Sequence, residues 1–419
     1  MKKIIGVLLF VFAAGHAQTN LDYFLRTAET NNPLLKEHAN QISASALQRD
    51  LIRSQQLLPQ ISLSAGYLFA PFFNNNGRLI STNPGDQAVG YDIGITNGGL
   101  YSAQINVEKT LFNGGTADAL SASQSIQEDA LRNTIALTKR DLARQVTDQY
   151  LQTYQSRRLY ELSRETSTNI KTLLSILEKL VAQGTAKQSE YLLLSVEFES
   201  KTTAAADSYV QFATNRSQLC TLCGITDTTA VQIDSVSVTL RTDRPRFEFT
   251  KKFEYDSLTT RSQQEQFENK YRPQVSVFFS TGLNAVELDN IQRKFGLSAG
   301  VNFSLPLFDG NQRSITRQQN QLSLQSIANY RAAYAVQLDN QRKNTLDRME
   351  NLRTTVQSYV RQAAGYEQLL RIAENELRRG QVTMVEYLTL LNNYIEVRKN
   401  RISAETEMQR EINNYNYWN

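Results

Sequence analysis

Two cysteines, Cys220 and Cys223, have the type and spacing most typical of a redox-active or metal-binding pair. A Cys-x-x-Cys pair can exchange a disulfide or supply two metal ligands, but two thiolates alone do not complete a tetrahedral zinc site. No predicted strand precedes the pair, as one does in a thioredoxin-like unit. The alternative is that both are small apolar side chains on one face of a helix that ends at Gly224. This second interpretation is favoured, although an oxidising compartment could still join the two sulfurs.

Histidine offers little further chemistry, because the chain has only His16 and His38 and the first lies in a predicted signal peptide. A single remaining histidine is poor support for a metal site or for acid–base catalysis. No nucleophile is paired with a base anywhere in the sequence. We therefore expect no catalytic residue, no metal and no cofactor, and an enzyme would have to depend on the cysteine pair.

The N-terminus has the pattern of a secretory signal peptide. Two lysines precede an apolar run over residues 4–14, and small residues follow at 15–17, so residues 1–17 are expected to be removed. The apolar run is too short to cross a bilayer as a helix. Without those two lysines the formal charge of +4 falls to +2 (4 − 2). A nearly balanced chain gives no reason to expect nucleic acid as a partner.

Four segments alternate apolar and polar residues, as strands with two unlike faces do. They form two predicted β-hairpins, at 60–111 and 274–305. Each segment has about 10 residues, and a tilted membrane strand needs roughly 9–11. Four strands cannot close a barrel, and lipid does not tolerate an open sheet edge. Either the strands belong to a soluble sheet, or several copies pool them, and three copies would supply twelve.

Each hairpin is followed by a long predicted helix without proline, at 116–182 and at 312–379. Such a helix is on the order of 100 Å long at about 1.5 Å per residue. In the second helix a seven-residue recurrence indicates packing along a neighbouring helix. The recurring residues are Leu338, Thr345, Leu352, Tyr359, Tyr366 and Ala373. A fibrous coiled coil would explain these helices but not the strands that precede them.

Both long helices end in a short reversal, here called a tip, at 183–186 and at 380–384. Return helices are predicted to follow at 187–222 and 385–417, and a further helix over residues 20–57 precedes the first hairpin.

These elements describe an internal duplication. Phe112 and Gly184 are 72 residues apart, as are Phe308 and Gly380 (184 − 112 and 380 − 308). The landmarks of the two copies are 196 residues apart (308 − 112), whereas the prolines before the hairpins, Pro59 and Pro273, are 214 apart (273 − 59).

The first hairpin loop is therefore longer by 18 residues (214 − 196). The first repeat covers 18–224 and the second 271–419, joined by an equatorial connector at 225–270. The part of the connector at 227–250 favours β structure because it is rich in valine and isoleucine.

With these elements in order, the sequence resembles the TolC family of outer-membrane efflux proteins over nearly the whole chain after the signal peptide. The resemblance rests on duplicated motifs at corresponding places. They are Leu21-x3-Leu25-x2-Ala28-x2-Asn31-Asn32-Pro33, the entries Leu58-Pro59-Gln60-Ile61-Ser62 and Arg272-Pro273-Gln274-Val275-Ser276, the exits Leu111-Phe112-Asn113-Gly114-Gly115 and Leu305-Pro306-Leu307-Phe308-Asp309-Gly310, and the tips Gly184-x5-Glu190-Tyr191-Leu192 and Gly380-x5-Glu386-Tyr387-Leu388.

The resemblance implies an α+β membrane protein built from a duplicated strand-strand-long helix-helix unit. In that family a homotrimer forms a twelve-stranded outer-membrane β-barrel, continuous with a periplasmic α-helical barrel. The implied function is the passive exit duct of a tripartite efflux or type I secretion system. Its implied partners are a periplasmic membrane-fusion adaptor, an inner-membrane pump of the RND or ABC type, and outer-membrane lipid. A different class, a periplasmic coiled-coil scaffold or adaptor without a membrane barrel, stays open at this point.

The resemblance also assigns candidate sites. The junction between barrel and tunnel carries Phe112, Gly114, Phe308 and Gly310. The periplasmic tips that would dock the adaptor carry Gly184, Glu190, Tyr191, Gly380, Glu386 and Tyr387.

Within the tips, Glu386 matches an acidic position that lines the closed constriction in that family, but Thr389 stands where a second acid often sits. The alternative for Glu386 is a solvated carboxylate near a helix start, favoured there by the helix dipole. For Tyr191 and Tyr387 the favoured interpretation is packing beside the turn.

Overall fold

The computed structural model describes residues 20–81, 83–92, 99–228, 231–241, 248–285 and 290–419, and the predicted signal peptide lies outside them. The chain divides into two compact units. The sheet unit contains residues 38–134 and 250–332, and the helical unit contains residues 1–37, 135–249 and 333–419. Two long helices, α3 (Thr116–Ala182) and α6 (Gln312–Arg378), contribute residues to both units.

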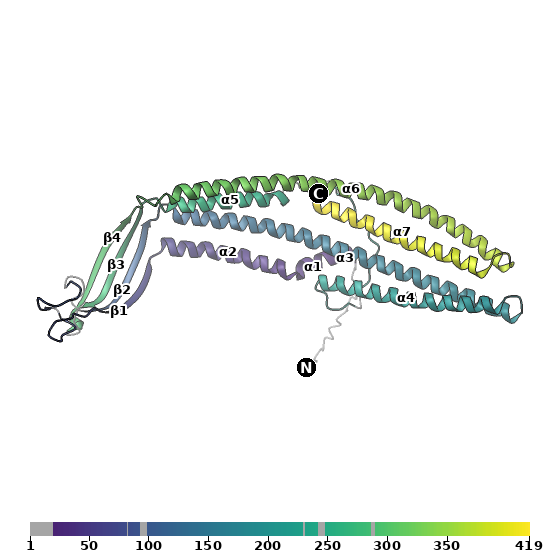
Figure 1. The fold of residues 1–419 in the computed structure, drawn as a ribbon, viewed down its shortest axis with the longest axis horizontal. Helices are drawn as coiled ribbons and strands as arrows, with labels where there is room; N and C mark the ends of the chain where they lie inside the picture. Colours follow the sequence, from purple (N-terminus) through teal and green to yellow (C-terminus); the bar gives the residue numbers. More distant parts are fainter. Residues whose placement is uncertain (1–19, 82, 93–98, 229–230, 242–247, 286–289) are drawn as a thin grey trace, which may run out of the picture. The chain divides into compact units, whose positions relative to one another are not determined.

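The sheet unit is built on four consecutive antiparallel strands in the order β1-β2-β3-β4 (Figure 1). The strands are β1 (Gln60–Phe69), β2 (Gly99–Phe112), β3 (Gln274–Ala285) and β4 (Phe295–Ser304), with the short helix η1 (Ile291–Arg293) before β4. The register aligns side chains of one kind across the strands, since Leu63 pairs with Ile105 and Ser62 with Asn106. One face of the sheet is therefore apolar and the other polar.

The polar face is held together by side-chain hydrogen bonds between strands. The Asn106 amide donates to Ser64 Oγ at 2.7 Å, and Ser280 Oγ donates to Asn106 Oδ1 at 2.7 Å. These bonds join β1, β2 and β3 through uncharged groups. Satisfied pairs of this kind contribute to the pairing of neighbouring strands.

Among the described residues of the sheet unit, no element covers the apolar face. Ile61, Leu63 and Leu297 are 72%, 76% and 75% exposed. Exposed apolar surface of this extent indicates an interaction with lipid or with another protein. Among the described residues, no helix has both the length and the apolar character needed to cross a membrane.

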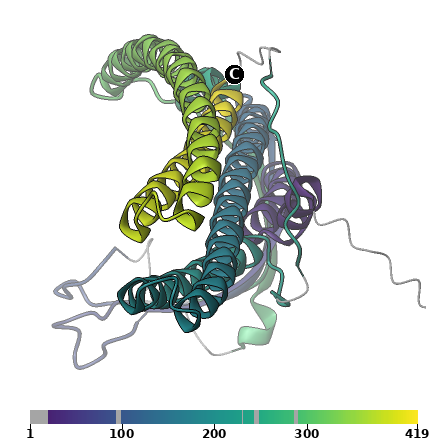
Figure 2. The ribbon, with the colours of Figure 1, turned by 90° about the vertical axis from the view of Figure 1, so that its right-hand side faces the viewer.

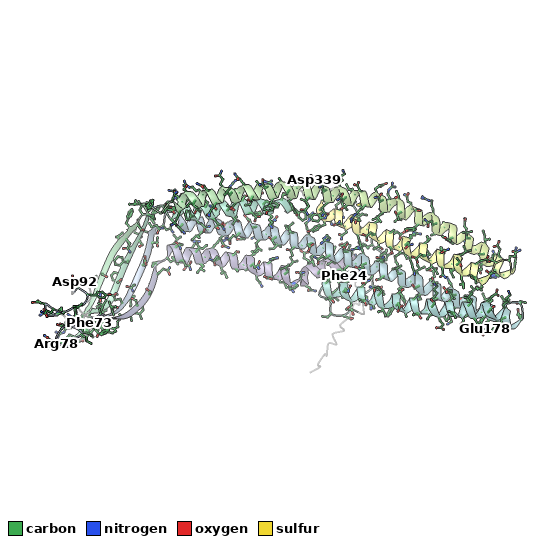
Figure 3. The ribbon with its side chains drawn as sticks, viewed as in Figure 1. Phe24, Phe73, Arg78, Asp92, Glu178 and Asp339 are labelled. Carbon is green, nitrogen blue, oxygen red and sulfur yellow. The ribbon has the colours of Figure 1, made fainter. Side chains whose placement is uncertain are left out.

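The loop beyond β1 and β2 is folded on its own backbone. Phe72 N donates to Leu79 O at 2.8 Å, and Gly85 N donates to the buried Asn75 Oδ1 at 2.9 Å. Figure 3 labels Phe73, Arg78 and Asp92 in this region, next to the free ends of the strands. The predicted loop is thus an ordered structure over the part that is described.

The helical unit consists of two antiparallel helix hairpins and the short helix α1 (Leu21–Asn31). In one hairpin α3 lies beside α4 (Gln188–Leu222), and in the other α6 lies beside α7 (Met384–Trp418) (Figure 2). In α6 the six predicted heptad residues are all buried or partly buried, whereas most of the remaining surface of the helix is exposed. The heptad is therefore the packed stripe of this helix.

The duplication is visible in the helix lengths. Both α3 and α6 have 67 residues, and both α4 and α7 have 35. Their first residues are 196 positions apart (312 − 116 and 384 − 188), which is the spacing found in the sequence.

The connector differs from its predicted β structure. No strand forms in its described residues, and residues 231–241 run as an irregular segment before α5 (Glu248–Asn269). Its backbone is bound by side chains of α7, not by a neighbouring strand. Val238 N donates to Gln409 Oε1 at 2.6 Å, and Arg241 N donates to Asn416 Oδ1 at 2.7 Å. Side-chain amides thus replace the backbone partners that a strand requires.

The charged second half of the connector forms the helix α5 and leads into β3, as α2 (Pro33–Leu57) leads into β1. The duplication therefore extends further upstream than the sequence indicated.

Candidate functional sites at the helix tips and strand exits

Both tips are helix reversals built on a glycine with left-handed backbone. Gly184 and Gly380 each have φ of +72°, and no atom lies within 4 Å of a Cβ built on either. At the first tip, Gly184 N donates to Val181 O at 2.9 Å and Thr185 N donates to Leu180 O at 2.9 Å. This pair of bonds is a Schellman motif, which closes a helix C-terminus around a glycine.

The second tip repeats the motif. Gly380 N donates to Leu377 O at 3.0 Å, and Gln381 N donates to Glu376 O at 2.9 Å. The two glycines singled out from the sequence thus terminate the two long helices in the same way.

The return helix of the second tip starts with a complete capping box. Glu386 N donates to Thr383 Oγ1 at 3.3 Å, and Thr383 N donates to Glu386 Oε2 at 2.8 Å. Hydrogen bonds from the Thr383 backbone and hydroxyl hold the pKa of Glu386 below its usual value. Glu386 is therefore an ionised, exposed carboxylate at a helix start, where the helix dipole also favours negative charge.

The first tip has only half of this arrangement. Lys187 occupies the cap position and has no side-chain oxygen, so its backbone N–H donates to Glu190 Oε2 at 3.4 Å without a reciprocal bond. Glu190 and Glu386 hold equivalent positions, but only Glu386 is fixed by a cap on both sides.

Tyr191 and Tyr387 pack beside the turns, as favoured from the sequence. Both are partly buried against one apolar cluster that joins the two hairpins near their tips. The buried members of this cluster are Ile170, Leu177, Leu194, Met384 and Leu388. Burial raises the pKa of Tyr387.

A groove of about 530 Å³ lies between the two tips. Apolar residues such as Leu173 and Leu377 line its floor, and charged groups such as Lys187 and Arg379 stand along it. At its rim Arg378 is paired with Glu374 at 2.7 Å. Leu192 and Val385, on the two return helices, are 56% and 60% exposed. The tips thus present apolar and charged side chains together.

Ion pairs tie α7 to α3 above the tips. Arg158 contacts Glu405 at 2.7 Å, Arg398 contacts Glu165 at 3.1 Å, and Arg410 contacts Asp148 at 3.3 Å. The Arg158–Glu405 pair is partly shielded from solvent, so it is screened less by salt than a surface pair.

The strand exits carry the four predicted junction residues. Gly114 and Gly310 both have φ of +65° and begin equivalent turns after β2 and β4. Phe112 is 51% exposed and Phe308 89% exposed. The exits therefore share their backbone but differ in what covers them.

The second exit also holds a polar network that sequence reasoning did not predict. Tyr271 Oη donates to Asp309 Oδ2 at 2.6 Å, and Arg313 N donates to the same carboxylate at 2.7 Å. Glu268 binds Arg313 at 2.6 Å and also Arg317 at 2.5 Å. The Tyr271 hydroxyl lowers the pKa of Asp309, and the Arg317 guanidinium lowers that of Glu268.

This network fixes the end of α5 to the start of α6. The only signal in the sequence was Asp309 in the turn before a helix, a position that favours a capping carboxylate. Its partners lie on another element, which spacing alone does not reveal.

The cysteine pair lies in a buried core of the helical unit. Cys220 and Cys223 are free thiols and pack with Phe24, Val146 and Tyr150. Burial raises the pKa of Cys223 to about 12. The pair therefore belongs to the core, as favoured from the sequence. The described residues contain no group of three potential metal-binding side chains.

Comparisons with known proteins agree with these features. Residues 24–224 match the model of the outer membrane efflux protein family. No curated protein sequence matches the chain. A membrane protein from Pseudomonas aeruginosa is 16% identical with a TM-score of 0.74, over 95% of this chain and 89% of that one. The outer membrane protein VceC from Vibrio cholerae is 14% identical with a TM-score of 0.70, over 94% of each chain.

The outer membrane channel MtrE of Neisseria gonorrhoeae, described in an open state, is 13% identical with a TM-score of 0.70, over 95% of this chain and 88% of that one. At these identities the similarity concerns the fold. The chain thus shares the fold of these outer membrane proteins, and residues 24–224 match the outer membrane efflux protein family.

Proposed function

We propose that this protein is the passive exit duct of a tripartite efflux or type I secretion system, working as a homotrimer with a periplasmic adaptor and an inner-membrane pump. The match of residues 24–224 to the outer membrane efflux protein family and the shared fold support a channel of the outer membrane, with its long helices in the periplasm. We propose in addition that it forms a trimer, that its tips bind the adaptor, and that the pump is of the RND or ABC class.

The observation that carries the proposal is a four-stranded sheet that cannot be stable in a membrane alone. Its strands β1 and β4 are each paired on one side only, and its apolar face is exposed. Unpaired backbone groups cost several kcal/mol each in lipid, by the usual estimate, so the edges must meet other edges. Three copies supply twelve strands, an even number within the range of closed outer-membrane barrels.

The two faces of the sheet support the same conclusion. In a closed barrel the apolar side chains would face lipid, and the serine and asparagine side chains would face the interior. Near the loop end of β1 and β2, Tyr67 and Tyr101 stack on the apolar face with ring centroids 4.8 Å apart. Aromatic residues in such a place are typical of a membrane–water boundary. Outer-membrane lipid is therefore a proposed partner.

The tips support the proposed docking of an adaptor. The groove between them joins apolar side chains to charges of both signs, and Leu192 and Val385 leave apolar area uncovered beside it. Such mixed surfaces suit reversible contacts with a protein partner. We assign Gly184, Glu190, Tyr191, Gly380, Glu386 and Tyr387 to this docking end.

Glu386 is further proposed as an acidic group of the closed constriction. Its ionised carboxylate is held in one orientation by Thr383, so in a trimer three such charges would attract cations and repel anions. In this proposal the energy for transport comes from the inner-membrane pump.

The test uses the full chain purified in detergent and inserted into planar lipid bilayers. We expect a trimeric mass by native mass spectrometry, resistance of the membrane-bound protein to carbonate extraction, and stepwise conductance. A monomeric mass, or release by carbonate without detergent, would contradict the duct and favour a soluble periplasmic scaffold.

A further inference from the structure

Two equivalent turns of the duplicated unit differ in what lies against them. Gly114 and Gly310 have the same φ, and the residues after them, Gly115 and Asn311, also have positive φ. A Cβ at Gly114 would lie 2.7 Å from Arg272 Cβ and 3.1 Å from Asn269 O, whereas at Gly310 nothing lies within 4 Å. The first turn is packed and the second is open.

The turn at Gly114 is covered by the segment between α5 and β3. Arg272 Nη1 donates to Gly114 O at 3.0 Å, and the Asn269 amide donates to Gly115 O at 3.1 Å. This segment, residues 269–273, therefore holds the exit of β2 through both hydrogen bonds and close packing.

The strand registers identify the counterpart of that segment. Gln60 pairs with Glu108 in the first hairpin, and Gln274 pairs with Ser304 in the second. The corresponding positions are 214 and 196 apart (274 − 60 and 304 − 108). These are the shifts seen in the sequence, so the two hairpins have the same internal register.

The shift of 214 makes residues 55–59 the counterpart of residues 269–273. The shift of 196 makes Gly310 the counterpart of Gly114. However, residues 55–59 lead into β1, which lies at the opposite edge of the sheet from β4. Within one chain they cannot cover Gly310, because β2 and β3 lie between the two edges. Only a second copy of the chain can place them there.

Exposure along the open turn fits such an occupant. Leu307 and Phe308 are 91% and 89% exposed, and Ile315 is 50% exposed where its counterpart in the first repeat, Ala119, is 4% exposed. On the other side, Leu58 replaces Arg272 and is 57% exposed. An apolar contact between copies would thus replace the polar contact found within the chain.

We propose that residues 55–59 of the next copy seat on the Gly310 turn, and that β4 pairs with β1 of that copy in the register that the duplication specifies. This inference rests on the proposed homotrimer and adds its contacts. Within the chain Lys109 pairs with Val277 and Asn106 with Ser280. The two shifts convert these pairs into Leu305 with Leu63 and Asn302 with Gly66 of the next copy.

Glu108 pairs with Phe278 within the chain. The two shifts convert this pair into Ser304 and Ser64 of the next copy (108 + 196 and 278 − 214). These three converted pairs place leucine opposite leucine, serine opposite serine and asparagine opposite glycine. A register shifted by one residue would break this match along the whole strand.

Disulfide cross-linking of the full chain tests the register. Directly opposed Cβ atoms lie about 4.5–5.5 Å apart and diagonal neighbours about 7–8 Å apart, and a disulfide requires roughly 3.5–4.5 Å. The predicted pair is Ser64→Cys with Ser304→Cys, a nearly isosteric change at both positions. The matched controls are Ser62→Cys and Gly66→Cys, each combined with Ser304→Cys, and each single variant.

Cross-linking within one chain is excluded by the two strands between β1 and β4, so any linked product joins copies. We expect linked dimers and trimers on non-reducing gels for Ser64→Cys with Ser304→Cys and at least tenfold less for the controls. Native mass spectrometry of the same samples reports the trimer independently.

A trimeric mass with cross-linking in a control pair, or in none of the three, would overturn the inference and leave the proposed function standing. A monomeric mass would overturn both.

Discussion

Thr383 and Glu386 cap the second return helix for each other, with the Glu386 carboxylate 2.8 Å from Thr383 N and 2.9 Å from Thr383 Oγ1. The carboxylate that the family resemblance assigns to the constriction is thus also a structural group. Any test of its charge must keep the cap.

Replacing Glu386 with glutamine separates the two roles. Glutamine keeps an oxygen for the capping box but carries no charge. We expect Glu386→Gln to form trimers of wild-type stability that conduct with weaker block by divalent cations, measured in planar bilayers. Glu386→Ala should lose both the block and part of the helix start. Unchanged block in both variants would remove Glu386 from the constriction.

The same carboxylate predicts a pH dependence with a definite sign. The pKa of Glu386 in the folded protein lies below its usual value, so the contribution of its carboxylate to stability is fully present above that usual value. It is lost as the pH falls through the lower folded pKa. We expect the protection of amides at the start of α7 against hydrogen exchange, measured relative to the intrinsic rate at each pH, to fall in this acid range for the wild type. Glu386→Gln should show no such step, and an equal step would assign it to another group.

The capping role of Thr383 can be tested by comparison with Lys187, which holds the same position in the first tip. Thr383→Ala removes the acceptor for Glu386 N and should cost about 1 kcal/mol of local stability, as loss of a helix cap commonly does. Lys187→Ala is the matched control, because Lys187 offers no side-chain acceptor. Hydrogen exchange should increase at the start of α7 only in Thr383→Ala, and equal effects at both tips would contradict the capping role.

The tips and long helices were predictable because their signals are local. Gly115 and Gly310 precede α3 and α6, and Gly184 and Gly380 mark the turns after them. The irregular structure of the connector was not predictable, because its backbone binds α7 side chains such as Gln409 and Asn416, which are more than 170 residues away in the sequence. The polar network around Asp309 was not predicted for the same reason, because Glu268 and Tyr271 lie about 40 residues earlier in the sequence, at the end of α5 and just after it.

Glycine substitutions distinguish turn positions from helix interiors. Gly380→Ala places a Cβ on a left-handed residue, which should cost roughly 1–2 kcal/mol. Gly365 lies inside α6 with no atom within 4 Å of a built Cβ, so Gly365→Ala should stabilise by roughly 0.5–1 kcal/mol. Thermal unfolding of the two trimers should shift in opposite directions. Stabilisation by Gly380→Ala would contradict the tip geometry.

Two paired glycines of the sheet offer a test with its own control. Gly282 and Gly296 lie opposite each other on β3 and β4. A Cβ at Gly282 would lie 2.2 Å from Ala103 O, a backbone atom that cannot move aside, whereas nothing lies within 4 Å at Gly296. Gly282→Ala should therefore lower the yield of membrane-inserted trimer severalfold, and Gly296→Ala should not. Comparable yields would contradict the close approach of β2 and β3.

The cysteine pair predicts a difference in reactivity between folded and unfolded protein. Burial raises the pKa of both thiols, that of Cys223 to about 12, so neither is a thiolate near neutral pH while the core is closed. Since the thiolate is the reactive form, alkylation at pH 8 should be slow in the native trimer and rapid in denaturant. Intact-mass spectrometry counts the modified thiols in each case. Two rapid modifications in the native protein would place the pair outside the core formed with Phe24 and Tyr150, and none after denaturation without reductant would reveal a disulfide.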